Sequence, residues 1–170
     1  MARKPIKRPV VLPLFDRLLQ GDNIEVDVNS DRAIQVLRES IRRDLEILFN
    51  TRPYYRPIPK EFEELGTSVV SFGLPDLQIQ QLGAASQKEE CRSRLKEAIR
   101  RFEPRLRDVS VEIIEGEQES RERILRFRID AIMDVAEMSE AVVYDTFVDP
   151  VSGSMRLAHE TRARAGISGI

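Results

Sequence analysis

The chain has 170 residues, of which 41% are hydrophobic and 33% are charged, and its formal net charge is -2 at pH 7. This composition is typical of one soluble globular domain with tails, and the lack of a basic excess argues against a general nucleic-acid binder. No apolar run approaches the roughly 18 residues that a membrane span needs. A lone cysteine, Cys91, cannot form an internal disulfide. We therefore expect a cytoplasmic protein.

The cations are biased toward arginine, with 22 arginines against 5 lysines. Arginine is enriched at protein interfaces and lysine is depleted there, so the bias favours a protein that binds other proteins. A genomic preference for arginine codons explains the bias equally well.

The N-terminal third is expected to be helical. Residues 1–13 form a basic, flexible arm, and residues 14–19 form a short amphipathic helix that ends at Gly21. Asn29 and Ser30 can cap a helix over residues 31–49, and Asn50 can cap its C-terminal end. The apolar face of this helix repeats at helical spacing, with Ile34, Leu37, Ile41, Leu45 and Leu48.

Residues 51–66 contain three closely spaced prolines and are expected to form an extended surface loop. Tyr54 and Tyr55 in this loop are candidate contact residues, because tyrosine is a common interface anchor; covering the edge of the core is an equally good role for them. A short helical or turn element is expected over residues 68–74. Ser86 and Glu89 fit a capping box for a helix over residues 87–102, which places Cys91 in the core.

The end of that helix carries the most informative motif, Glu103-Pro104-Arg105, in a stretch that holds four arginines between positions 100 and 107. Pro104 stops the helix and should send the two charged side chains in defined directions. Arginine suits two-point recognition of carboxylates. We therefore take Glu103, Pro104, Arg105 and the neighbouring Arg101 as candidate interface residues. The alternative is a plain helix stop with cations near the negative end of the helix dipole.

After Pro104 the hydrophobic period changes from 3.6 to 2, which indicates strands. Strands are expected over residues 109–113, 125–133, 141–148 and 154–158, with a turn at 149–153. Helices followed by an antiparallel meander predict an α+β fold, in which N-terminal helices pack on a three- to four-stranded, mostly antiparallel sheet. We expect a single domain over residues 14–158 and a flexible tail over 159–170.

The residues for common chemistries are missing from the sequence. The one histidine, His159, lies near the C-terminal end, and neither a zinc-spaced Cys/His cluster nor a glycine-rich phosphate loop is present. A pair of carboxylates is available, but tryptophan is absent and aromatics make up only 6%, so sugar-stacking side chains are few. We expect no enzymatic activity, no cofactor and no metal.

Three segments together resemble a known family. They are Leu45-Glu46-Ile47-Leu48-Phe49-Asn50-Thr51-Arg52, Ser68-Val69-Val70-Ser71-Phe72-Gly73-Leu74-Pro75-Asp76 and Ile99-Arg100-Arg101-Phe102-Glu103-Pro104-Arg105-Leu106. In order and spacing they resemble the TssE family of type VI secretion baseplate subunits, which is similar to the small wedge proteins of contractile phage tails. The likeness covers about residues 14–158. It departs at Ser71-Phe72, where the family more often has Asn-Tyr.

The resemblance implies a structural subunit in a six-fold baseplate, docked at the inner face of the cytoplasmic membrane. Its implied partners are the wedge subunits TssF and TssG and the sheath proteins TssB and TssC. A sheath strand added to an open edge of the antiparallel sheet would suit a seeding role; an edge covered by the chain's own tail is the alternative. The older label of the family, lysozyme-like, implies the runner-up function, a peptidoglycan-cleaving glycosidase.

Overall fold

The computed structural model describes residues 15, 18, 31–54, 59, 61–75, 85–114, 125–135, 138–149 and 152–159. The expected arm (1–13) and residues 160–170 of the expected tail lie outside these residues. Of the expected helix over 14–19, only Phe15 and Leu18 are described, and both are helical.

Two long helices are present, as the hydrophobic spacing predicts. Helix α2 spans Asp31–Asn50 and α3 spans Ala85–Phe102. Each helix buries the stripe expected from the sequence, and the buried members are Leu37, Ile41, Leu45, Leu48, Cys91, Leu95, Ala98 and Ile99. The capping-box prediction at Ser86 is wrong: Ala85 is already helical, so Ser86 lies inside α3, whereas an N-cap residue must have non-helical geometry.

Four strands follow the helices and form one antiparallel sheet in the order β1-β2-β3-β4. Their bounds are Leu106–Ile114, Leu125–Val135, Met138–Val148 and Met155–His159. The predicted α+β class and the helices-then-meander order are therefore confirmed. The turn between β3 and β4 is closed by the Asp149 N–H donating to the Ser154 carbonyl (2.9 Å), and Gly153 supplies a φ of +68°.

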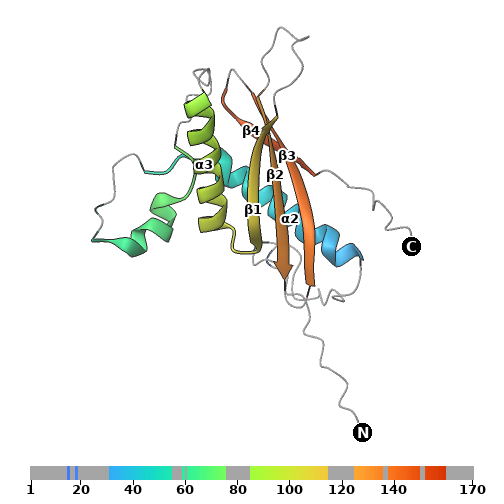
Figure 1. Ribbon diagram of the computed structural model, residues 1–170. Coiled ribbons are helices and arrows are strands. Elements are labelled where there is room, and N and C mark those ends of the chain that lie inside the picture. The colour runs from blue at the N-terminus through green and yellow to red at the C-terminus, as the bar shows by residue number, and fades with distance from the viewer. Residues whose placement is uncertain are drawn as a thin grey trace.

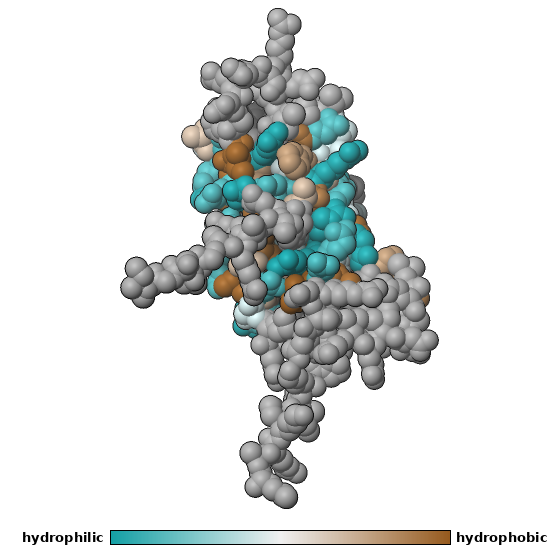
Figure 2. Space-filling model, turned by 90° about the vertical axis from the view of Figure 1, so that its right-hand side faces the viewer, coloured by the Kyte–Doolittle hydropathy of each residue, from teal (hydrophilic) through white to brown (hydrophobic). Residues whose placement is uncertain are grey.

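The helices and the sheet form two layers around one core. Alternate sheet residues, among them Val111, Phe127, Ile129, Tyr144 and Val148, are buried together with the helix stripes. Figure 1 shows α3 standing beside β1 while α2 crosses behind the sheet toward β4. Figure 2 turns the β3 and β4 side to the viewer, where brown and teal residues are interleaved among the coloured ones.

Two short 3₁₀ helices, η1 (Glu63–Thr67) and η2 (Val69–Ser71), lie between α2 and α3 in the sequence. Figure 1 shows them projecting from the body on the side of α3 away from the sheet. The expected short helical element over 68–74 is thus confirmed. The Leu74 N–H donates to the Thr51 carbonyl at 2.9 Å, which ties the returning chain to the end of α2. Gly73 permits this approach: its φ is +121°, and a Cβ there would lie 2.3 Å from the Thr51 oxygen.

Candidate protein-interaction site

The motif Glu103-Pro104-Arg105 forms a sharp corner between α3 and β1. The Glu103 N–H still donates to the Ile99 carbonyl (2.8 Å), and the Leu106 N–H donates to the Glu103 carbonyl (3.1 Å). Pro104, which has no N–H to donate, is exposed at the tip of the turn. The chain therefore changes from helix to strand within three residues, as the proline predicts.

The charged side chains of this corner point at each other and at α2. The Arg105 guanidinium donates from Nε to Glu103 Oε1 (2.6 Å) and also bonds the second oxygen of that carboxylate through Nη2. Nη2 donates to Asp44 Oδ2 as well (2.7 Å), and Nη1 lies 3.4 Å from Ser40 Oγ. Arg105 thus makes the two-point carboxylate contact that its planar fork favours, and makes it within its own chain.

Burial makes this cluster strong. Glu103 is only 4% exposed, and its Oε1 also accepts the Arg105 backbone N–H at 3.2 Å. Burial alone would lower the pKa of the Arg105 guanidinium, but the Glu103 and Asp44 carboxylates together outweigh it and raise that pKa. Arg105 therefore stays charged, and its bonds fix the end of α3, the start of β1 and the middle of α2 to one another.

The other candidate residues lie on the surface near this corner. Arg101 is exposed, pairs with Glu97 (2.8 Å) and reaches the Gly66 carbonyl (3.4 Å). Tyr54 is 54% exposed, and its N–H donates to the Val70 carbonyl (3.0 Å). Tyr55 lies outside the described residues. The structure thus brings Arg101 and Tyr54 to one region, while Glu103 is buried and Arg105 is partly buried.

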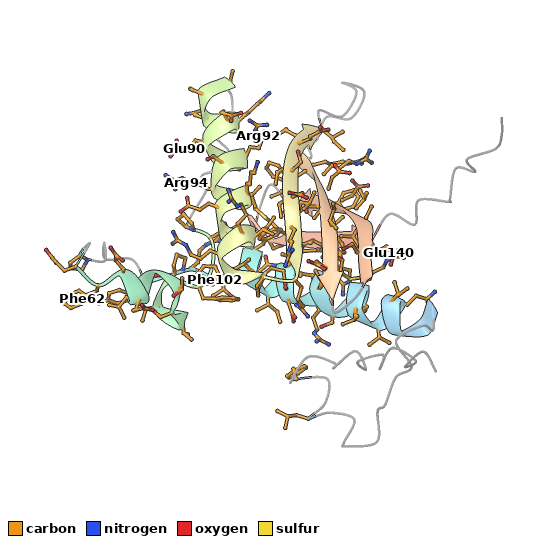
Figure 3. All side chains as sticks on the ribbon, turned by 60° about the horizontal axis from the view of Figure 1, so that its bottom comes forward. Phe62, Glu90, Arg92, Arg94, Phe102 and Glu140 are labelled. Atoms are coloured by element: carbon orange, nitrogen blue, oxygen red, sulfur yellow. The ribbon has the colours of Figure 1, made fainter. Side chains whose placement is uncertain are left out.

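Arg101 and Tyr54 line a groove of about 720 Å³ between α3 and the two 3₁₀ helices. Phe102 contributes to its wall and meets Phe72 edge-on, with 5.3 Å between ring centroids. Figure 3 shows Phe102 on the side of α3 that faces the 3₁₀ helices, with Phe62 farther out, just before η1. Exposed apolar side chains border this region, namely Phe62, Leu65, Val69 and Val70.

Sequence reasoning missed both the groove and two members of the corner. Ser40 and Asp44 lie 65 and 61 residues from Arg105, so spacing could not pair them with it. Phe62 carried one usable signal, because it is a large apolar residue in the 51–66 segment, which otherwise reads as a surface loop.

Two further observations bear on the class of protein. Among the described residues, no helix is long and apolar enough to cross a membrane. Burial raises the pKa of the Cys91 thiol to about 11, which is the behaviour of a core residue and not of a nucleophile.

The chain was compared with known proteins. A family model described as baseplate wedge protein gp25 matches residues 35–137, which include most of α2, the groove, the corner and the first two strands. No curated protein matches the chain.

Proposed function

Because the chain belongs to the gp25 baseplate wedge family, we propose that it acts as the TssE-type baseplate subunit of a type VI secretion system. The family is a structural component of contractile-tail baseplates. The observation that carries the proposal for this chain is that it combines a rigid frame with an open four-stranded sheet. The frame consists of α2, the end of α3 and the start of β1, which Arg105 links through its bonds to Asp44 and Glu103. A frame of this kind can hold two contact surfaces in a fixed relation.

The first contact surface takes the wedge subunits TssF and TssG. It comprises Pro104, Arg101, Tyr54 and, by sequence position, Tyr55. Exposed arginine and tyrosine beside apolar side chains are the composition of protein interfaces. Glu103 and Arg105 support this surface from below by fixing the direction in which α3 ends.

The second contact surface is the sheet, which seeds the sheath of TssB and TssC by strand addition. An open sheet has edge strands whose N–H and C=O groups can pair with an added strand, and β1 and β4 are the terminal strands here. The subunit works in the cytoplasm, at baseplates docked on the inner face of the cytoplasmic membrane.

Wedge binding is tested by co-purification with TssF and TssG. Arg101→Ala and Tyr54→Ala should each reduce recovery of the complex while leaving thermal melting nearly unchanged. Arg92→Ala is the matched control, because Arg92 is an exposed, ion-paired arginine of the same helix that does not line the groove. Full recovery with both groove variants would remove this surface from the proposal.

Sheath seeding is tested in cells by fluorescence of a labelled sheath protein. Proline is introduced at Val143 or at Met155, one at a time, and each variant is first shown to be folded. Proline removes a backbone donor while adding no charge, so it reports on main-chain pairing. Sheath formation that survives both folded variants would show that the sheath docks elsewhere.

The proposed subunit has no peptidoglycan hydrolase activity. Incubation of purified protein with cell-wall sacculi should release no muropeptides above the buffer control. Release that disappears when one particular carboxylate is replaced would overturn the structural role in favour of a lysozyme-like glycosidase.

A further inference from the structure

Arg126, Phe147 and Arg156 form one row across three strands of the sheet. The register pairs Arg126 of β2 with Phe147 of β3, and Phe147 with Arg156 of β4. Residues that lie opposite each other in antiparallel strands project from the same face of the sheet. Tyr144 and Val148, at even positions of β3, belong to the core. The odd-numbered Phe147 and its two arginines therefore lie on the other face, away from the core.

The side chains of this row, here called the Arg–Phe–Arg row, are accessible from outside. Arg126 and Arg156 are exposed, and Phe147 is half-buried. The Arg126 guanidinium lies over the Phe147 ring, 5.1 Å from its centroid, which is cation–π geometry. Stacking uses the flat face of the guanidinium, so the N–H donors at its edge can still bind a carboxylate. The row therefore has an apolar centre with a cation on each side.

The two arginines of the row differ from the other arginines in the described strands. Arg107 pairs with Asp134 at 2.8 Å, and Arg128 pairs with Asp145 at 3.1 Å. Among the described residues, neither arginine of the Arg–Phe–Arg row forms an ion pair. The sheet thus neutralises its other arginines internally and leaves uncompensated the two that flank the phenylalanine. Because both are exposed, their charge is available to an anion from outside the chain.

The surroundings of the row favour separate carboxylates over a phosphate chain. The register places Glu112, Arg128 and Asp145 in the adjacent row of the same face. Glu112 is exposed, and Asp145 is paired with Arg128, so this second row carries negative charge in excess. A nucleic acid that extended past the arginines would be repelled there, and the chain as a whole has a net charge of -2. A basic strip one residue wide fits single carboxylates.

The occupant must also bring apolar surface of its own. Neighbouring strands lie about 4.8 Å apart, so the backbones at Arg126 and Arg156 are about 10 Å apart with Phe147 between them. An exposed arginine–carboxylate pair contributes little by itself, because water screens it. A protein segment covers Phe147 with an apolar side chain and excludes water from both ion pairs, which a small dicarboxylate cannot do.

We propose that the Arg–Phe–Arg row binds an acidic segment of a partner protein. The segment carries an apolar side chain that packs on Phe147 and, on each side of it, a carboxylate that accepts from Arg126 or Arg156. A contact that needs three aligned side chains selects a partner by the spacing of its carboxylates as well as by its charge. This surface is separate from the groove and from the edges of the sheet, so the inference goes beyond the proposed function and does not depend on it.

An NMR titration of the full chain tests the inference, with the side-chain Nε–H signals of Arg126 and Arg156 as the readout. The probe is the synthetic peptide acetyl-Glu-Ser-Leu-Ser-Glu-amide, whose extended form places the leucine and both glutamates on one side. Both arginine signals should shift, with a dissociation constant in the millimolar range or tighter. The same peptide with glutamine in place of both glutamates should leave them unshifted.

Substitutions separate the row from positive charge in general. Arg126→Gln and Arg156→Gln should each weaken peptide binding about threefold, and the double variant about tenfold. Arg107→Gln is the matched control and should bind normally, because this exposed arginine of the same sheet is already paired with Asp134. Phe147→Leu keeps an apolar side chain but removes the ring under Arg126, so it should weaken binding less than the double variant. Thermal melting of the arginine variants should be nearly unchanged, because these side chains are exposed.

Four other outcomes would overturn the inference. If neither arginine signal shifts, or if the glutamine peptide or the double variant binds equally well, the row does not recognise carboxylates. Tighter binding of an oligothymidylate of the same charge assigns the row to nucleic acid instead. Replacement of the glutamates of residues 115–122 by glutamine provides the last check. If this change shifts both arginine signals in the free protein, the chain's own acidic segment occupies the row.

Discussion

The corner at Glu103–Arg105 and the groove beside Arg101 adjoin in the sequence, yet they are built in opposite ways. At the corner, charged groups are buried and satisfied by Asp44, Ser40 and the local backbone. In the groove, apolar side chains remain exposed, and Phe62 is 56% accessible. Buried ion pairs fix geometry, while exposed apolar surface is what a partner can cover. The residues that hold the frame are therefore separate from those that we propose to meet a partner.

The largest expected effect is at the corner. Glu103→Ala leaves the Arg105 charge partly uncompensated, and Arg105→Ala does the same to Glu103. Each should lower the free energy of unfolding by about 3–5 kcal/mol, measured by chemical denaturation. Assembly with wedge subunits should fall in parallel, because the frame is lost. Normal stability with lost assembly would instead assign the motif to a direct partner contact, worth about 2–5 kcal/mol.

A smaller effect is expected at Asn50, another residue whose polar groups are satisfied within the fold. Asn50→Ala leaves the Met155 N–H and C=O without their hydrogen-bond partner, which should lower the free energy of unfolding by about 1–3 kcal/mol. Thr51→Ala is the matched control: it removes only an exposed bond to the Ile47 carbonyl. The Met155 amide should exchange faster with solvent in the Asn50→Ala variant and not in Thr51→Ala. Equal losses of unfolding free energy in the two variants would contradict the role given to Asn50.

The smallest effect on stability is expected in the groove region. Val69→Ser should change the free energy of unfolding by no more than about 0.5 kcal/mol, because the side chain makes few contacts in the isolated chain. It should nevertheless weaken co-purification with wedge subunits. A stability loss comparable to that at Glu103 would show that the exposed valine belongs to the frame, and the distinction between the two regions would fail.

The sequence alone identifies features that depend on near neighbours. Hydrophobic spacing predicts α2, α3 and the meander, and the helix stop at Pro104 follows from the proline itself. The strand ends were predicted less well: β3 begins at Met138, three residues before the expected start, because Ser139 and Glu140 look polar although they pair with β2. Local propensity cannot show such pairing.

Contacts between distant segments were beyond sequence reasoning. Asn50 was expected to end a helix, and it does, but its two bonds to Met155 join positions 105 residues apart. The partners of Arg105 on α2 were hidden for the same reason. Glu103 and Arg105 were taken from the motif as interface residues, and only the fold reveals that they bond each other before any partner arrives.

Helix α2 is held to the sheet at two points, one in its N-terminal half and one at its C-terminal end. Toward its start, the Tyr144 hydroxyl donates to the Arg38 carbonyl (3.1 Å) and Arg38 pairs with Glu140; at its end, Asn50 holds Met155. Arg38 and Asn50 are 12 positions apart, which is about 18 Å along the helix. A force that pulls on the edge of the sheet is therefore resisted at both contact points and by the helix between them. We expect the strands to stay attached to α2 together and not to detach one at a time.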